Sequence, residues 1–160
     1  MDKENKEILL KDLCARLPFG VICRYDTVVP LLGEVLNNGE LQEIKNRGKY
    51  FIVNGATCLY DDIKPYLRPM SSMTEEEKEE LKNIIWFGYP SDDYDDYGHR
   101  GIGIVDLKYD DWKEFGFDFE DYCKLEDWLN SHHFDYRGLI ERGLGLDCTG
   151  LNIYDNEKSI

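Results

Sequence analysis

The sequence has little positive charge and no long apolar run, and these two absences exclude several classes of protein. Its 19 Lys and Arg residues against 33 Asp and Glu residues give a formal net charge of −14. Binding to nucleic-acid phosphates requires clustered basic residues, so we expect no direct nucleic-acid binding and no polybasic membrane anchor. No stretch approaches the ~20 apolar residues of a membrane span. The charged segment 1–13 lacks the apolar core of a signal peptide, which predicts a cytoplasmic protein.

Motifs that would identify a cofactor or a catalytic nucleophile are also missing. The sequence has no phosphate-binding loop, dinucleotide-binding glycine pattern, zinc-protease helix or nucleophile elbow, so we expect no cofactor and no metal. The five cysteines are far apart, which is typical of buried thiols in a reducing compartment. Cys14 falls on the apolar face of a predicted helix, and Cys23 and Cys58 fall in predicted strands. These positions favour the core over catalysis.

Charge is distributed very unevenly along the chain. Residues 1–72 hold ten basic and ten acidic residues, whereas residues 73–160 hold nine basic and 23 acidic residues. The whole excess of negative charge therefore lies in the second part, which predicts one acidic face. Two interpretations stay open. Either the charge maintains solubility, or the acidic face meets a basic partner or mimics nucleic acid.

The pattern of apolar residues in the first part predicts a helix followed by a β-unit. Residues 3–17 are expected to form an amphipathic helix that ends at a Pro and a Gly. Residues 20–68 are expected to form a small antiparallel β-meander or an SH3-like barrel. Tight turns are predicted at residues 37–39 and 54–55, because Asn-Gly pairs favour hairpins.

The second part is expected to be mainly helical and acidic, which makes the overall class α+β. A capping box of Thr74 and Glu77 predicts a helix start. Further helices are expected from Lys124 and from Asp135, whose carboxylate can cap a helix. Any boundary between the two parts, 1–72 and 73–160, falls near residues 70–73, and we expect both to pack as one compact unit.

Residues 88–101 are the least regular stretch, and we expect an exposed acidic loop there. Its aspartates lack the alternating spacing of a calcium-binding loop, so they predict no metal site. The segment 109–122 carries aromatic residues among acids, a composition that favours a binding surface where it is exposed. The predicted binding residues of these two segments are Asp92, Asp93, Tyr94, Asp95, Asp96, Tyr97, Trp112, Phe115 and Phe117.

His132 and His133 are the main candidates for catalysis, because histidine serves as a general base or a metal ligand. Adjacent side chains in a helical turn point about 100° apart, so both rings seldom reach one metal ion. One interpretation is structural, with one ring capping a helix end and the other packed. The alternative is a small hydrolase that uses both histidines with Asp127 or Asp135. An ion pair between Asp135 and Arg137 is a further structural expectation.

Three segments of the chain resemble a known family. Residues 11–20, 64–76 and 128–143 are similar to small proteins encoded by gut Bacteroidales genomes, their prophages and mobile elements. The matched segments cover about a quarter of the chain and leave out the acidic stretch 88–122. The resemblance implies that the protein acts in a bacterial cytosol, a setting that extends to phage infection. It implies no activity, cofactor or catalytic residue.

These observations together predict a non-enzymatic accessory protein of a bacterium or its phage. It is expected to act by protein–protein contact through its acidic face, with a basic protein as the partner. A mimic of nucleic acid that blocks a host protein is one version of this hypothesis. The alternatives are the small hydrolase that uses His132 and His133 and a phage structural component that self-assembles.

Overall fold

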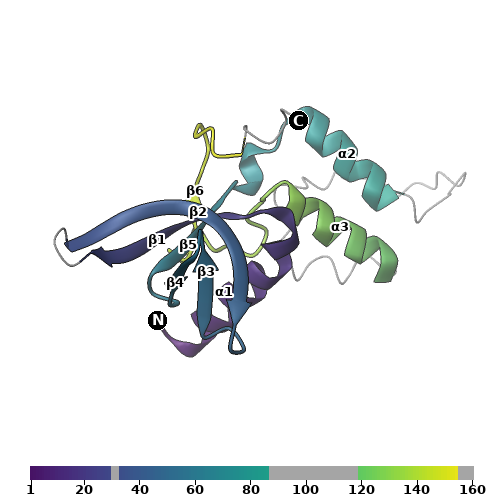
Figure 1. Cartoon of the computed structure of the whole chain (residues 1–160). Helices are drawn as coiled ribbons and strands as arrows, with labels where there is room; N and C mark the ends of the chain where they lie inside the picture. The colour runs from purple at the N-terminus through teal and green to yellow at the C-terminus, as the bar shows by residue number, and fades with distance from the viewer. Residues whose placement is uncertain (30–32, 87–118, 155–160) are drawn as a thin grey trace, which may run out of the picture.

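The structure, a computed structural model, describes residues 1–29, 33–86 and 119–154. It combines a six-stranded sheet, a helix packed on that sheet and a pair of helices beside it, which confirms the α+β class (Figure 1). The helices are α1 (Lys3–Arg16), α2 (Glu75–Trp86) and α3 (Phe119–Ser131), with short 3₁₀ turns η1 (Leu17–Phe19) and η2 (Met70–Ser72). The strands are β1 (Ile22–Val29), β2 (Gly33–Lys45), β3 (Tyr50–Val53), β4 (Ala56–Cys58), β5 (Ile63–Leu67) and β6 (Leu146–Asp147).

Helix α1 begins and ends close to its predicted limits. The Asp2 carboxylate caps the start by accepting a 2.8 Å hydrogen bond from the Asn5 amide. After η1, Gly20 turns the chain with a φ of 68°, a left-handed conformation that glycine adopts without strain. The buried stripe differs from the predicted one, because it is centred on Leu9, Leu13 and Arg16. Cys14 therefore falls on the outer face and is exposed, which contradicts its predicted core position.

The sheet has the strand order β4-β3-β2-β1-β5-β6, antiparallel except for the parallel pair β5 and β6. Two strands separate β4 from β1, so in a flat sheet they would lie ~14 Å apart. Cα atoms of β4 and β1 nevertheless approach within 8 Å, so the sheet curls. Strand β2 visibly arches in Figure 1, and a register shift between Leu41 and Glu43 marks a bulge in it.

The predicted turn at residues 37–39 is wrong, because β2 runs straight through it. Gly39 pairs with Cys23 within the β1–β2 ladder, one pair from its end. A Cβ atom on Gly39 would lie 2.5 Å from Cγ of Asn54. Glycine is therefore needed at this position because the Asn54 side chain packs against it, and not because the chain turns. The predicted turn at residues 54–55 is confirmed, since it joins β3 to β4 with positive φ at both positions.

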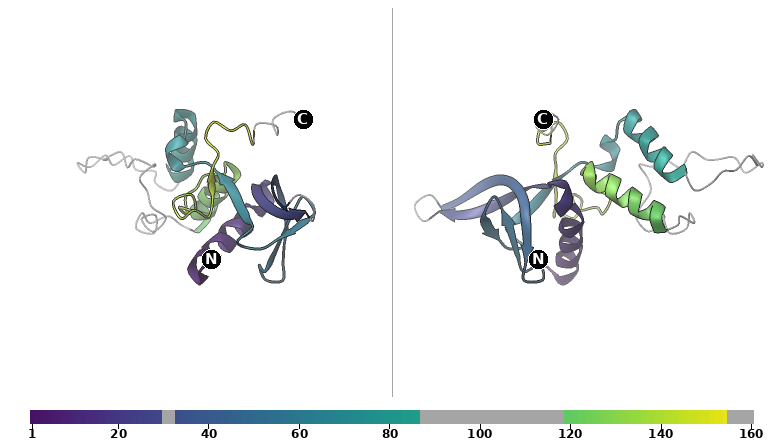
Figure 2. Two further views of the ribbon diagram at one scale, coloured as in Figure 1. Left: turned by 90° about the vertical axis from the view of Figure 1, so that its left-hand side faces the viewer. Right: turned by 45° about the vertical axis from the view of Figure 1, so that its right-hand side comes forward.

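Two clusters of buried apolar side chains form the core. The cluster between α1 and the sheet consists of Leu9, Leu13, Val21, Cys23, Tyr25, Leu41, Phe51, Val53, Cys58, Ile63, Leu67, Leu139 and Leu144. The cluster between α2, α3 and the turn after α3 consists of Met73, Leu81, Leu125, Leu129, Phe134 and Tyr136. Figure 2 shows α2 and α3 beside each other and away from the N-terminal end of α1.

The end of the described chain returns to the sheet. Strand β6 pairs with β5, and the Cys148 amide donates a 2.9 Å hydrogen bond to the Leu67 carbonyl. The Tyr154 hydroxyl then bridges β1 and β5, because it accepts from the Ile22 amide at 3.2 Å and donates to the Tyr66 carbonyl at 2.7 Å. Residues from the last part of the chain thus complete the sheet formed by the first part.

Two helix predictions in the second part need correction. Helix α3 begins at Phe119, earlier than the predicted Lys124. Turns replace the helix that was predicted after Asp135. Gly138 and Gly143 adopt φ angles of 70° and 69°, whereas residues of an α-helix have negative φ. Within the described ranges, no helix combines the length and apolar character that crossing a membrane requires.

Candidate functional site

The predicted binding residues of the acidic segment lie outside the described residues. They are Asp92, Asp93, Tyr94, Asp95, Asp96, Tyr97, Trp112, Phe115 and Phe117. The excess of negative charge extends into α2 and α3, which together carry nine acidic residues against three lysines. Negative charge is therefore in excess on both of these helices.

The orientation of α2 is set at its first turn. The predicted capping box is confirmed, since the Thr74 amide donates to the Glu77 carboxylate at 2.8 Å and the Glu77 amide donates to the Thr74 hydroxyl at 3.2 Å. Both Glu77 carboxylate oxygens also accept from the Arg68 guanidinium, at 2.7 and 2.8 Å. This bidentate pair lowers the pKa of Glu77 against the opposing effect of burial. It turns the Glu77 side of α2 inward, where Leu81 is fully buried.

An exposed acidic stripe lies on another side of α2. Glu76, Glu79 and Glu80 follow the i, i+3, i+4 spacing of one helix face, and all three are exposed. We call these three residues the α2 acidic face. The Nε1–H group of Trp128 in α3 donates to the Glu80 carboxylate at 3.4 Å, and Asp127 next to it is also exposed. The acidic stripe thus lies beside a partly exposed tryptophan at the seam between α2 and α3.

Carboxylates of α2 and α3 differ in whether a cation neutralises them. Glu75 pairs with Lys78 at 2.6 Å, and Glu120 pairs with Lys124 at 2.8 Å. Glu76 and Asp127 form no ion pair with any residue in the described ranges. An exposed carboxylate that no cation neutralises attracts basic groups through the solvent. At physiological salt this attraction extends over the Debye length of roughly 8 Å.

His132 acts as a cap at the end of α3. Its Nδ1 atom lies 2.9 Å from the carbonyl oxygen of Trp128, so the Nδ1–H tautomer donates to that carbonyl. The imidazole ring also stacks on the Trp128 ring, with centroids 4.1 Å apart, and it lies 6.4 Å from the Phe134 ring. The ring therefore fills the capping role that the structural interpretation predicts.

His133 packs in the interior. Only 5% of its surface is exposed, and its ring stacks on the Tyr154 ring with centroids 3.7 Å apart. Burial, and to a smaller extent the charge of Arg16, lower the pKa of His133 to about 3. A ring with this pKa is neutral near pH 7 and is a weak base. This environment fits the packed role of the structural interpretation.

Asp135 and Arg137 do not form the predicted ion pair. The two Asp135 carboxylate oxygens accept from the amides of Leu139 and Ile140, at 2.7 and 2.8 Å. Burial raises the pKa of the Asp135 carboxyl against the effect of these two hydrogen bonds. Among the hydrogen bonds of the described residues, Asp135 has none to either histidine ring. Its carboxylate is held by the turn that follows it.

A buried ionic cluster that sequence patterns did not predict lies between α1 and the segment after α3. Asp12 and Arg16 are fully buried, and they pair at 2.7 Å. The Arg137 guanidinium donates to the same Asp12 carboxylate at 3.0 Å and to Glu126 at 3.1 Å. Arg16 also donates to the Phe134 carbonyl at 2.7 Å. The i, i+4 spacing of Asp12 and Arg16 on the same face as Leu9 and Leu13 was the signal that could have revealed it.

The buried cysteines Cys23, Cys58 and Cys148 lack the features of a nucleophile. Burial raises the pKa of Cys58 to about 11, and burial also raises the pKa values of Cys23 and Cys148. Such thiols stay protonated at neutral pH and react slowly. The described ranges also contain no group of three or more His, Cys, Asp or Glu side chains placed to hold a metal ion.

No protein-family model, no curated protein and no solved structure matches this chain.

Proposed function

We propose that the protein acts by binding a basic protein partner through the α2 acidic face. The observation that carries this proposal is the outward stripe of Glu76, Glu79 and Glu80 beside Trp128. Tryptophan is enriched among residues that dominate binding energy, because its large ring loses much water on contact. Exposed carboxylates around it steer a basic surface into place. Asp127 extends the same surface on α3.

The state of the candidate catalytic groups supports binding over hydrolysis as the function. His132 caps α3 and stacks on Trp128, and His133 is buried against Tyr154. Asp135 is bound to backbone amides. A general base must reach a proton of the substrate within hydrogen-bonding distance, and each of these groups is engaged with the protein itself.

We further propose the setting and the finer fold. The bacterial cytosol, with a gut Bacteroidales species or its phage as the source, is proposed from the resemblance of residues 11–20, 64–76 and 128–143. The curled order β4-β3-β2-β1-β5, with a long bulged β2, supports an SH3-like barrel. Helices α2 and α3 support a mainly helical acidic part after it.

The proposal is tested by affinity capture of the tagged chain from a Bacteroidales lysate at low and high salt, read by mass spectrometry. The expected result is one stoichiometric basic partner that is released as the salt concentration rises, because salt screens exposed charges. The acidic variant E76Q/E79Q/D127N is expected to recover at least tenfold less of that partner.

The matched control removes three exposed carboxylates elsewhere, in the variant E7Q/E40Q/E141Q, and it is expected to recover the partner at the wild-type level. Equal recovery by both variants would overturn the proposal, and so would capture of no basic protein at either salt concentration. Displacement of the partner by duplex DNA would support the version in which the acidic face mimics nucleic acid.

A further inference from the structure

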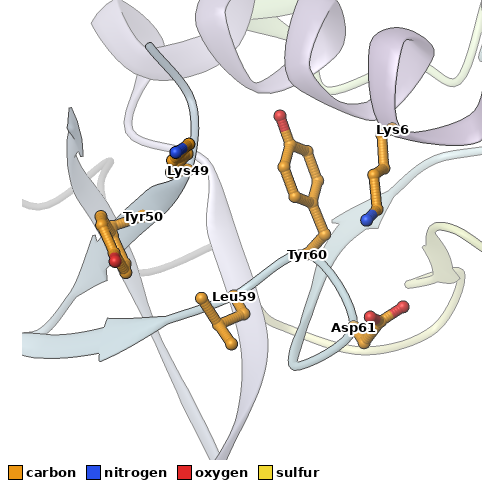
Figure 3. Close-up of a pocket in the computed structure, with 6 residues that line it drawn as sticks. All are labelled: Lys6, Lys49, Tyr50, Leu59, Tyr60 and Asp61. Carbon is orange, nitrogen blue, oxygen red and sulfur yellow. The ribbon is translucent and has the colours of Figure 1, made fainter. Parts of the chain in front are cut away.

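A pocket of about 280 Å³ has lining residues from α1 and from the sheet region, and none of them belongs to α2 or α3. It is formed by α1, by the turn that leads into β3 and by the segment between β4 and β5 (Figure 3). Its volume falls near the lower end of the range for ligand pockets, which suits a small molecule or a single peptide residue. The residues that line it are Lys6, Lys49, Tyr50, Leu59, Tyr60 and Asp61.

The wall of the pocket is anchored in the core. The Tyr60 ring packs edge-to-face on the fully buried Phe51 ring, with centroids 5.1 Å apart. The turn before β3 packs equally closely, since a Cβ on Gly48 would lie 2.5 Å from a Leu10 methyl carbon and 3.0 Å from the Tyr60 hydroxyl. Gly48 also has a φ of 83°, so other residues would be strained there. A pocket with such walls is formed before any ligand arrives.

Positive charge gathers at this pocket although the chain is strongly acidic. Figure 3 shows Tyr60 between the side chains of Lys6 and Lys49, which come from different elements. The Lys6 ammonium lies 5.6 Å from the centre of the Tyr60 ring, and Lys49 is exposed with no ion pair to any residue in the described ranges. Asp61, the one acidic lining residue, is paired with the terminal ammonium of Met1 at 3.1 Å. The local charge is therefore positive.

Apolar surface completes the pocket. Leu59 is 51% exposed and Tyr50 is 40% exposed, and both are among the few large apolar side chains that the described structure leaves in contact with water. A ligand that covers them gains the hydrophobic contribution of that area. A ligand that also carries a negative charge gains from both lysines.

We propose that this pocket binds a carboxylate joined to an aromatic or aliphatic group. The carboxylate lies in the combined field of the Lys6 and Lys49 ammonium groups, which flank the Tyr60 ring, and the apolar group covers Leu59 and Tyr50. The chemistry is that of a small aromatic acid or of a peptide ending in an apolar residue. The site goes beyond the proposed function, because its charge is opposite to that of the α2 acidic face.

Titration of the ¹⁵N-labelled full chain with 4-phenylbutyrate, followed by NMR, tests the proposal. Saturable shifts are expected at the amides of Lys49, Tyr50 and Tyr60, with a Kd in the millimolar range or tighter. Neutral 4-phenylbutyramide is expected to bind at least tenfold more weakly. The variant K6Q/K49Q is expected to lose at least tenfold in affinity for the acid, whereas K3Q/K45Q, with the same change of charge outside the pocket, keeps it.

A second arm distinguishes the two sources of the ligand. The peptide acetyl-Gly-Gly-Gly-Phe with a free carboxylate binds at least tenfold more tightly than 4-phenylbutyrate if the natural ligand is a peptide terminus. The two probes bind alike if it is a small acid, and both outcomes support the site. Equal binding of the acid and the amide, unchanged affinity in K6Q/K49Q, or shifts that map to α2 and α3 would each overturn it. None of these results depends on whether the α2 acidic face binds a partner.

Discussion

The Nη1 atom of Arg137 lies 3.0 Å from the Oδ1 atom of Asp12, although the two residues are 125 positions apart in the sequence. The same carboxylate accepts two hydrogen bonds from Arg16, at 2.7 and 3.0 Å. One fully buried carboxylate thus holds two arginines and ties α1 to the turn after α3. Since Arg137 also pairs with Glu126, this cluster fixes α3, and through α3 the acidic surface, relative to the sheet.

Removing the Asp12 charge should destabilise the fold strongly. Asp12→Asn leaves Arg16 and Arg137 buried without their shared counter-ion, and breaking a buried pair in this way costs about 3–5 kcal/mol. Urea denaturation measures the loss as a lower free energy of unfolding. The control is Glu4→Gln, which breaks the exposed 3.0 Å pair with Arg142 and should cost less than about 1 kcal/mol. Similar losses for both variants would show that the cluster does not hold the fold together.

The buried cluster also shows which features the sequence alone could not predict. Helix α1, the turn at residues 54–55 and the capping box of Thr74 and Glu77 depend on neighbouring residues, so local patterns were sufficient to predict them. Burial of Asp12 depends on Arg137, far along the chain, and no local pattern contains that pairing. The candidate site divides in the same way. Composition predicts an acidic face, whereas the orientation of α2 depends on the Arg68–Glu77 pair.

The misplaced turn at residues 37–39 has the same cause. An Asn-Gly pair indicates a hairpin when only the local backbone preference matters. Position 39 instead requires glycine because the Asn54 side chain occupies the space that a Cβ atom on residue 39 would need. The return of the chain to the sheet at β6 was missed because a two-residue strand has no pattern of its own.

Gly39→Ala provides a test of that close approach. The new Cβ would meet the Asn54 side chain at 2.5 Å, so the substitution should destabilise the wild-type background by about 1–3 kcal/mol. In the background Asn54→Gly, which removes the obstacle, the same substitution should be neutral or stabilising, because alanine restricts the unfolded chain. Urea denaturation of the four proteins gives the coupling. Additive effects would show that the Asn54 side chain is not what requires glycine at position 39.

The Tyr154 hydroxyl should contribute measurably to stability. Tyr154→Phe keeps the ring stacked on His133 but leaves the Ile22 amide and the Tyr66 carbonyl without their partner. Both hydrogen bonds are partly buried, and a group left unsatisfied costs up to about 1–3 kcal/mol, so the midpoint of thermal unfolding should fall. Tyr50→Phe removes a hydroxyl from an exposed side chain and serves as the control, with little change expected. Equal midpoints for the two variants would mean that Tyr154 does not fasten the end of the chain.

His133 should make the fold less stable in mild acid. Its pKa is about 3 in the folded state, where burial and then Arg16 disfavour the charged ring, and about 6.5 in the unfolded chain. Above pH 6.5 both states are neutral at this site. As the pH falls from about 6.5 to 3, only the unfolded state takes up the proton, so the free energy of unfolding falls by up to about 1.4 kcal/mol per pH unit.

His133→Asn removes this titration and keeps a residue type that tolerates the φ of 58° at this position. The difference in stability between the wild type and the variant should therefore shift in favour of the variant as the pH is lowered from 7 to 4. The Glu77 and Asp135 carboxyl groups titrate in both proteins and cancel in the comparison. A difference that stays constant with pH would show that His133 is not protected from protonation in the folded state.

The place where the partner binds is tested most directly by hydrogen–deuterium exchange of the full chain, alone and with the captured basic protein. Binding through the α2 acidic face predicts slower exchange of amides in residues 75–86 and 119–131, and no protection in the variant E76Q/E79Q/D127N. Unchanged exchange in both helices, with protection at the β-strands or at the Lys6 and Lys49 pocket, would contradict the proposed function.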